Sequence, residues 1–115
     1  MRHLNKQKKF HRESGQRKAL MKALVTALIS YGKIKTTSAK AKALRPEVEK
    51  MITRAKVKNP HNLRLIRKTL SVGATEKLFN EVAPRFSERK GGYTRIVNLG
   101  QRKSDSSKMA QIEFV

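Results

Sequence analysis

The sequence predicts an α+β domain of about four helices packed on a small sheet that contains a C-terminal antiparallel hairpin, preceded by a basic, extended N-terminal arm. Apolar residues recur at helical spacing from residue 14 to residue 82, and beyond residue 92 they alternate with the two-residue period of strands. Residues 1–13 show neither pattern and carry too many like charges to order without a partner. We therefore divide the chain into an arm, residues 1–13, and a single α+β domain, residues 14–115.

Two long helices open the predicted domain. The first follows Ser14 as its N-cap and ends at Gly32. Its apolar face consists of Leu20, Met21, Leu24, Val25, Leu28 and Ile29. After a short β-branched stretch, Thr37 or Ser38 caps the second helix. The apolar face of that helix consists of Ala41, Leu44, Val48, Met51, Ile52 and Ala55. Pro46 lies inside this pattern, so we expect one kinked helix, with a new segment that begins at Pro46 as the alternative.

Shorter helices and a hairpin complete the predicted domain. The helices span residues 62–70 and about 75–82, and Pro84 ends the helical half. Two strands, at 93–99 and 109–114, flank a polar loop and predict an antiparallel hairpin. The residues expected on one face of the last strand are Ala110, Ile112 and Phe114.

Net charge indicates the class of partner. The chain has 28 Lys and Arg residues against 8 Asp and Glu, a formal net charge of +20, so the folded chain repels itself unless a polyanion neutralises it. Residues 1–45 contain Glu13 as their only acidic residue, which concentrates the excess in the N-terminal third. This charge indicates a nucleic acid or an anionic membrane as the partner.

Cysteine usage and hydropathy indicate the compartment. The chain has no cysteine, which excludes disulfides and zinc fingers and fits a reducing environment. Its start lacks the apolar stretch of a secretory signal, and no apolar run approaches the roughly 20 residues that span a bilayer. We therefore expect a cytoplasmic protein with no membrane partner.

The titratable residues do not form a catalytic set. No two of His3, His11 and His61 have the i,i+4 spacing of metal ligands on a helix. Glu47 and Glu49 are two residues apart on a helix, so their side chains diverge. We expect no enzymatic activity, no metal, no cofactor and no small-molecule substrate.

Cations follow both predicted caps at helix starts. Helix N-termini carry partial positive charge and normally favour acidic residues in the first turn. Here the first turns contain instead Arg17 and Lys18 in one helix and Lys40 and Lys42 in the other. A phosphate at each start would meet free backbone N–H groups and a cation together, so these four residues are predicted to bind RNA. The alternative is that the four side chains only solubilise a helix face.

The arm is predicted to neutralise several phosphates. Its cations are Arg2, Lys6, Lys8, Lys9 and Arg12. Phe10 either stacks on an exposed base or packs on the adjoining helix, and the sequence favours neither.

A glycine pair among cations forms a third candidate site. The cations of this stretch are Arg85, Arg89, Lys90 and Arg95, which flank Gly91 and Gly92. Glycines allow close backbone approach, and successive N–H groups can form an anion-binding concavity. The alternative is a turn that only starts a strand. The spacing is not that of a P-loop.

Several motifs resemble one known family. These are Met1-Arg2-His3, Ile34–Lys42 (IKTTSAKAK), Leu78–Glu81 (LFNE), Pro84–Phe86 (PRF) and Gly91–Ile96 (GGYTRI). In order and over essentially the whole chain, they resemble the bacterial large-subunit ribosomal protein seventeen family. The resemblance implies binding of the large-subunit ribosomal RNA near the exit of the nascent-peptide tunnel, beside other large-subunit proteins. It also implies that the arm enters the RNA, and it adds the motif residues His3, Lys35 and Thr36 to the predicted contacts.

We therefore predict a structural constituent of the large ribosomal subunit that binds ribosomal RNA through phosphate and shape contacts. The alternative is a nucleoid-type basic DNA-binding regulator. A DNA-binding regulator should have a recognition helix, or should form a dimer that binds two half-sites. The longest predicted helix instead has an apolar stripe suited to a core. A membrane-surface helix is disfavoured because several helices and a hairpin are specified.

Overall fold

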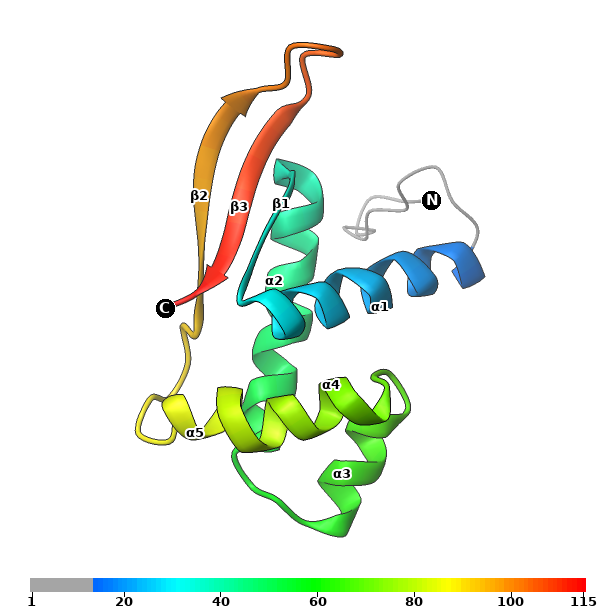
Figure 1. The fold of residues 1–115 in the computed structure, drawn as a ribbon, viewed down its shortest axis with the longest axis vertical. Coiled ribbons are helices and arrows are strands. Elements are labelled where there is room, and N and C mark those ends of the chain that lie inside the picture. The colour runs from blue at the N-terminus through cyan, green and yellow to red at the C-terminus, as the bar shows by residue number, and fades with distance from the viewer. Residues whose placement is uncertain (1–13) are drawn as a thin grey trace, which may run out of the picture.

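The computed structural model describes residues 14–115, which form helices and a three-stranded sheet (Figure 1). The predicted arm, residues 1–13, lies outside the described residues. The elements in chain order are α1 (Ser14–Tyr31), β1 (Lys33–Thr37), α2 (Ser38–Ala55), α3 (Pro60–Arg67), α4 (Val72–Lys77), a π-helical turn η1 (Leu78–Val82), α5 (Ala83–Arg85), β2 (Thr94–Gln101) and β3 (Lys108–Phe114). This arrangement confirms the predicted α+β class and the C-terminal hairpin.

The sheet is antiparallel throughout, with strand order β1-β3-β2. The hairpin strands β2 and β3 pair as expected, and β1 adds to the free edge of β3. Ile112 of β3 lies between Ile34 of β1 and Ile96 of β2 in register. Because side chains alternate across a strand, this row faces α2 while its neighbours in sequence face away. The β-branched stretch before α2 is therefore an edge strand of the sheet.

α2 lies against all three strands and forms the centre of the core. The six residues of its predicted apolar face are all buried. Thr37 is the N-cap, and its side-chain oxygen accepts a hydrogen bond from the backbone N–H of Lys40 at 3.3 Å. Pro46 is exposed within one uninterrupted helix, so the alternative of a new segment at Pro46 is wrong.

α1 differs from its prediction at its first turns. Ser14 is already helical, so it is not the N-cap. In its second half Val25, Leu28 and Ile29 are buried. The remaining predicted core residues, Leu20, Met21 and Leu24, are only half-buried. The reason is that the first half of α1 extends away from the rest of the described chain (Figure 1).

Both shorter helices begin earlier than predicted, because their caps lie before the predicted ranges. The Asn59 side chain accepts from the N–H of Asn62 at 2.8 Å, and Pro60 opens α3, where its missing N–H costs nothing. α3 ends at Arg67 and not at residue 70. The Ser71 hydroxyl oxygen caps α4, which therefore begins at Val72.

The helical half ends at Arg85, one residue beyond the predicted stop at Pro84. In the π-helical turn η1 the N–H of Ala83 donates to the carbonyl of Leu78, five residues earlier. Pro84 then lies in the first positions of α5, where no N–H is required, and the helical conformation continues to Arg85. The helical conformation thus passes a proline directly after a wider turn.

Two buried threonines provide a test of the core. Thr94 is 2% exposed and its hydroxyl has no hydrogen-bond partner among the described residues. Thr75 is 1% exposed and its hydroxyl donates to the carbonyl of Ser71 at 2.7 Å. We expect Thr94→Val to raise the free energy of unfolding by about 1 kcal/mol, and the matched Thr75→Val to lower it by about 1 kcal/mol, in urea titrations. Equal losses in both variants would mean that Thr94 has a partner.

Candidate nucleic-acid interface

The start of α2 gathers cations without acidic neighbours. No acidic residue lies in its first turn, and Thr37 satisfies only one of the four free N–H groups. Lys40 is half-buried, whereas Lys35 and Lys42 are exposed. None of these three lysines forms an ion pair within residues 14–115. The helix dipole and the Lys40 ammonium therefore act together on an anion at this end of α2, whereas Lys42, two residues further along the helix, diverges from Lys40.

Thr36 is the exception in this group. It pairs in register with Ala110 on the inner side of the sheet and is 8% exposed. Lys35, the residue before it, points to the opposite, open face because strand side chains alternate. The burial of Thr36 leaves little of its side chain for an RNA contact.

The start of α1 is a separate site. Its first turn also lacks acidic residues, with Arg17 half-buried and Lys18 exposed. α1 crosses α2, so the two helix starts lie at different parts of the surface and do not converge on one pocket (Figure 1). The predicted cations of these helices are thus divided between two places.

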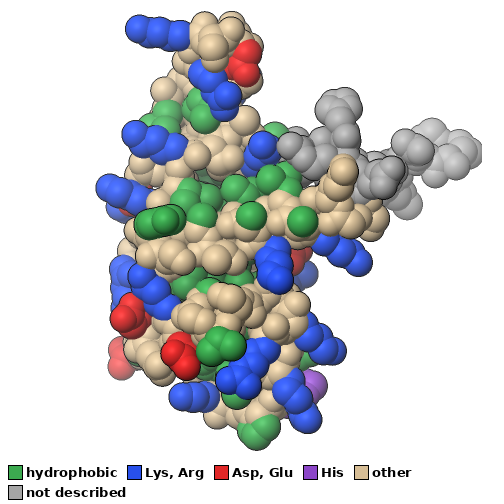
Figure 2. All heavy atoms as spheres, turned by 45° about the vertical axis from the view of Figure 1, so that its right-hand side comes forward, with side chains coloured by type: hydrophobic (Ala, Val, Ile, Leu, Met, Phe, Trp, Pro, Cys, Tyr) green, Lys and Arg blue, Asp and Glu red, His purple; other side chains and the backbone are tan. Residues whose placement is uncertain are grey.

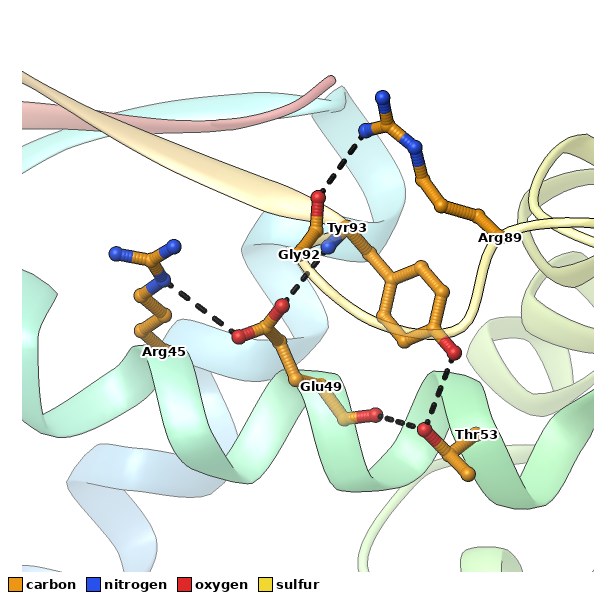
Figure 3. Close-up of polar contacts among 6 residues, drawn as sticks. All are labelled: Arg45, Glu49, Thr53, Arg89, Gly92 and Tyr93. Carbon is orange, nitrogen blue, oxygen red and sulfur yellow. Dashed lines mark hydrogen bonds and ion pairs between the residues drawn. The ribbon is translucent and has the colours of Figure 1, made fainter.

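The glycine loop between α5 and β2 is occupied by contacts of the chain itself (Figure 3). Gly92 adopts φ +62°, a left-handed conformation that suits glycine. The next N–H, that of Tyr93, donates to Glu49 Oε1 of α2 at 2.8 Å. Glu49 Oε2 lies 3.5 Å from Arg45 Nε. The backbone N–H that follows the glycine pair is therefore occupied by a carboxylate of α2.

The cations of this loop are also engaged within the chain. Arg89 donates to the carbonyl of Gly92 at 3.1 Å, and the carbonyl of Arg89 accepts from Lys56 Nζ. Arg95 Nε lies 3.4 Å from Glu113 Oε1. Lys90 is exposed. Arg85 packs on an aromatic ring: its guanidinium lies 5.4 Å from the ring centre of Phe86.

Tyr93 connects the loop to the core. Its ring packs against Phe86 with 5.3 Å between ring centres, and its side chain is 1% exposed. Its hydroxyl shares a hydrogen bond with Thr53 Oγ1 at 3.3 Å and accepts another from Lys56 Nζ at 3.3 Å. The bond to Thr53 lowers the pKa of the Tyr93 hydroxyl, burial opposes this, and Lys56 adds to the lowering. These contacts hold the loop in one conformation.

Acidic side chains of the described chain are mostly bound to cations. Besides Glu49 and Glu113, Glu81 lies 3.9 Å from Lys77, and Asp105 lies 3.7 Å from Arg102 at the hairpin tip. The hydrogen bond from the Ser107 N–H lowers the pKa of Asp105. Cations therefore dominate the surface that remains, and Figure 2 shows Lys and Arg side chains along the whole length of one face.

The described residues contain neither a metal-binding cluster nor a helix that could span a membrane. Within residues 14–115, no group of three or more His, Asp or Glu side chains is placed to hold a metal ion. None of the helices described combines the length and the apolar character needed to cross a bilayer. What these residues present is a cationic surface carried by a rigid α+β body.

Comparison with known proteins identifies the family. The model of the ribosomal protein L17 family matches residues 20–115. A large ribosomal subunit protein bL17 of Akkermansia muciniphila is 51% identical over 100% of this chain and 85% of its own length. The proteins of the same name from Gemmatimonas aurantiaca and Persephonella marina are 48% and 52% identical, over 100% of this chain and 98% and 95% of their lengths.

The chain therefore belongs to the ribosomal protein L17 family, whose members are structural proteins of the large ribosomal subunit and not enzymes. This confirms the resemblance seen in the sequence motifs.

The contact between Glu49 and the Tyr93 N–H should contribute measurably to stability. Replacing Glu49 by Ala leaves a partly buried donor without its charged acceptor, so we expect the free energy of unfolding to fall by about 2 kcal/mol. Hydrogen exchange of the Tyr93 amide should accelerate in the same variant. The control is Glu47→Ala, an exposed glutamate on the same helix, which should change stability by less than about 0.5 kcal/mol. Equal effects of the two variants would contradict this role.

Proposed function

We propose that the chain is a structural constituent of the large ribosomal subunit that binds the large-subunit ribosomal RNA through phosphate and shape contacts. The observation that carries the proposal is the pair of helix starts at which cations stand in place of acidic residues and make no ion pair within the described chain. A phosphate supplies the negative charge that each start lacks. RNA is the polyanion that neutralises the net charge of +20.

Shape recognition suits this body. Duplex RNA presents a deep, narrow major groove that side chains do not read, so proteins recognise it by phosphates and by its minor-groove surface. The two helix starts lie on separate parts of a rigid body, which would set the relative position of the RNA segments they contact. We further propose, from the family resemblance, a location near the exit of the peptide tunnel beside other large-subunit proteins in the cytoplasm.

Substitution at the helix starts tests phosphate binding. We expect Arg17→Glu and Lys40→Glu each to weaken binding to large-subunit ribosomal RNA roughly tenfold, about 1.4 kcal/mol, in filter-binding titrations. The salt dependence of log K should also fall by about one for each lost phosphate contact. The matched control is Lys22→Glu, which makes the same charge change at an exposed position past the first turns of α1. Equal losses in all three variants would reduce the effect to net charge.

Removal of residues 1–13 tests the division into arm and domain. The described residues, 14–115, form one buried apolar cluster among themselves, so the truncated chain should melt cooperatively at an unchanged or higher temperature. Its net charge falls from +20 to +16, because five cations and Glu13 are removed. Affinity for ribosomal RNA should fall and depend less on salt, because fewer phosphate contacts release counterions. Loss of cooperative melting would show that the arm belongs to the fold.

A further inference from the structure

We propose that the exposed face of α3 is a second RNA-binding surface, which contacts an RNA segment other than those at the starts of α1 and α2. This inference rests on the proposed function, since it concerns the same partner. None of the residues of α3 belongs to the contacts predicted from the sequence. Three features support this surface: the charge of the segment around α3, the position of its side chains and its distance from the start of α2.

The segment around α3 contains cations only. From residue 50 to residue 75 there is no Asp or Glu, whereas Glu49 and Glu76 stand directly at its two ends. The cations of this segment are Lys50, Arg54, Lys56, Lys58, Arg64, Arg67 and Lys68. Over residues 46–84 the four glutamates lower the net charge to +4, which conceals this excess.

α3 separates its apolar and basic residues onto opposite faces. Ile66 is 1% exposed and points into the core. His61, Arg64 and Lys68 follow one another at spacings of three and four, so they lie along a single line of the helix, about one 5.4 Å turn apart. This line is opposite Ile66, and Arg67 lies beside it. All four of these side chains belong to exposed residues, and Figure 2 shows Lys and Arg side chains next to the His of the described chain.

The basic side chains of this face have no partner within residues 14–115. No hydrogen bond or ion pair of the described chain involves the side chains of Arg64, Arg67 or Lys68. The helix dipole stabilises cations in a last turn by about 0.3–1 kcal/mol each. This effect alone would explain why Arg64 and Arg67 stand in the last turn of α3. It does not account for Lys58 and His61 before and at the start of the helix.

The composition of the face favours RNA over a protein partner. The centre of a protein interface is usually apolar, with aromatic anchors and few charges. The face of α3 has the reverse composition, because its central line is made of Arg, Lys and His. An acidic polymer with regularly spaced charges is the complementary partner, and in a family of ribosomal proteins that polymer is RNA.

α3 lies far enough from the start of α2 for the two surfaces to bind phosphates independently. α2 has 18 residues, so its two ends are about 27 Å apart at 1.5 Å per residue. α3 follows the far end of α2, as Figure 1 shows. This distance is several times the Debye length of about 8 Å in physiological salt, so the two surfaces attract phosphates separately. Together they would hold two RNA segments at a spacing fixed by α2.

A triple substitution with a matched control tests the proposal. The α3 variant is Arg64→Gln, Arg67→Gln and Lys68→Gln. The control removes the same charge at Arg45, Lys77 and Arg102, each also to Gln, because these three cations are paired with acidic residues of the chain. A charge-preserving variant, Arg64→Lys with Arg67→Lys, checks that the effect follows charge and not packing. Urea unfolding of all variants confirms that each is folded.

Binding to large-subunit ribosomal RNA is measured over a range of salt, together with hydroxyl-radical footprints on the same RNA. We expect the α3 variant to lower the salt dependence of log K by about two to three, as three lost phosphate contacts require. It should also lose one group of protected nucleotides, while the nucleotides that depend on Arg17 and Lys40 stay protected. The control and charge-preserving variants should keep both properties.

The outcomes separate the two proposals. If the unchanged protein protects no nucleotides and binds without salt dependence, the proposed function itself fails. If the unchanged protein binds, but the α3 variant keeps every protection and behaves as the control does, only the second surface is refuted. Loss of the same nucleotides in the α3 variant and in Lys40→Glu would also refute it, because the two surfaces would then share one RNA segment.

Discussion

The fold depends on the burial of one face of α2. Its six apolar residues repeat at helical spacing, and the face contacts the sheet while the helix also touches α1, α3, η1 and α5. A domain of this size buries only about two thirds of the surface of its unfolded chain, so little apolar area is available elsewhere. One helix therefore serves as the common support of the sheet and of the helical half. Its length also sets the separation of the cationic surfaces at its two ends.

Local patterns predicted much of this fold, and contacts between distant residues account for the rest. The buried face of α2 and the inner face of β3 follow from spacing alone, because burial imposes the period of each element on the sequence. The pairing of β1 with β3 could not be predicted, since a five-residue strand that could pair with either of two other strands carries no register signal. The course of the chain past Pro84 depends on a π-helical turn, for which the sequence has no marker.

The candidate interface was predictable at the helix starts and less so in the glycine loop. Cations after a cap are visible in the sequence, and the described structure leaves Lys40 and Lys42 without internal ion pairs. The loop has the composition of an anion-binding site, but the group that accepts from its Tyr93 N–H is the carboxylate of Glu49. These two residues are 44 positions apart in the sequence. Only the folded chain shows that this carboxylate reaches the loop. A count of acidic residues in short windows would have drawn attention to α3.

The position of β3 has a consequence for how the chain acquires its structure during synthesis. β3 lies between the other two strands, although it comes last in chain order. β1 leaves the ribosome with no strand to pair with, and α2 emerges with the sheet side of its apolar face uncovered. Both must wait until residues 108–114 are made, because non-local strand pairing closes last and slowly. A chain released before that point would expose an apolar helix face beside an unpaired edge, the features by which quality control recognises unfinished proteins.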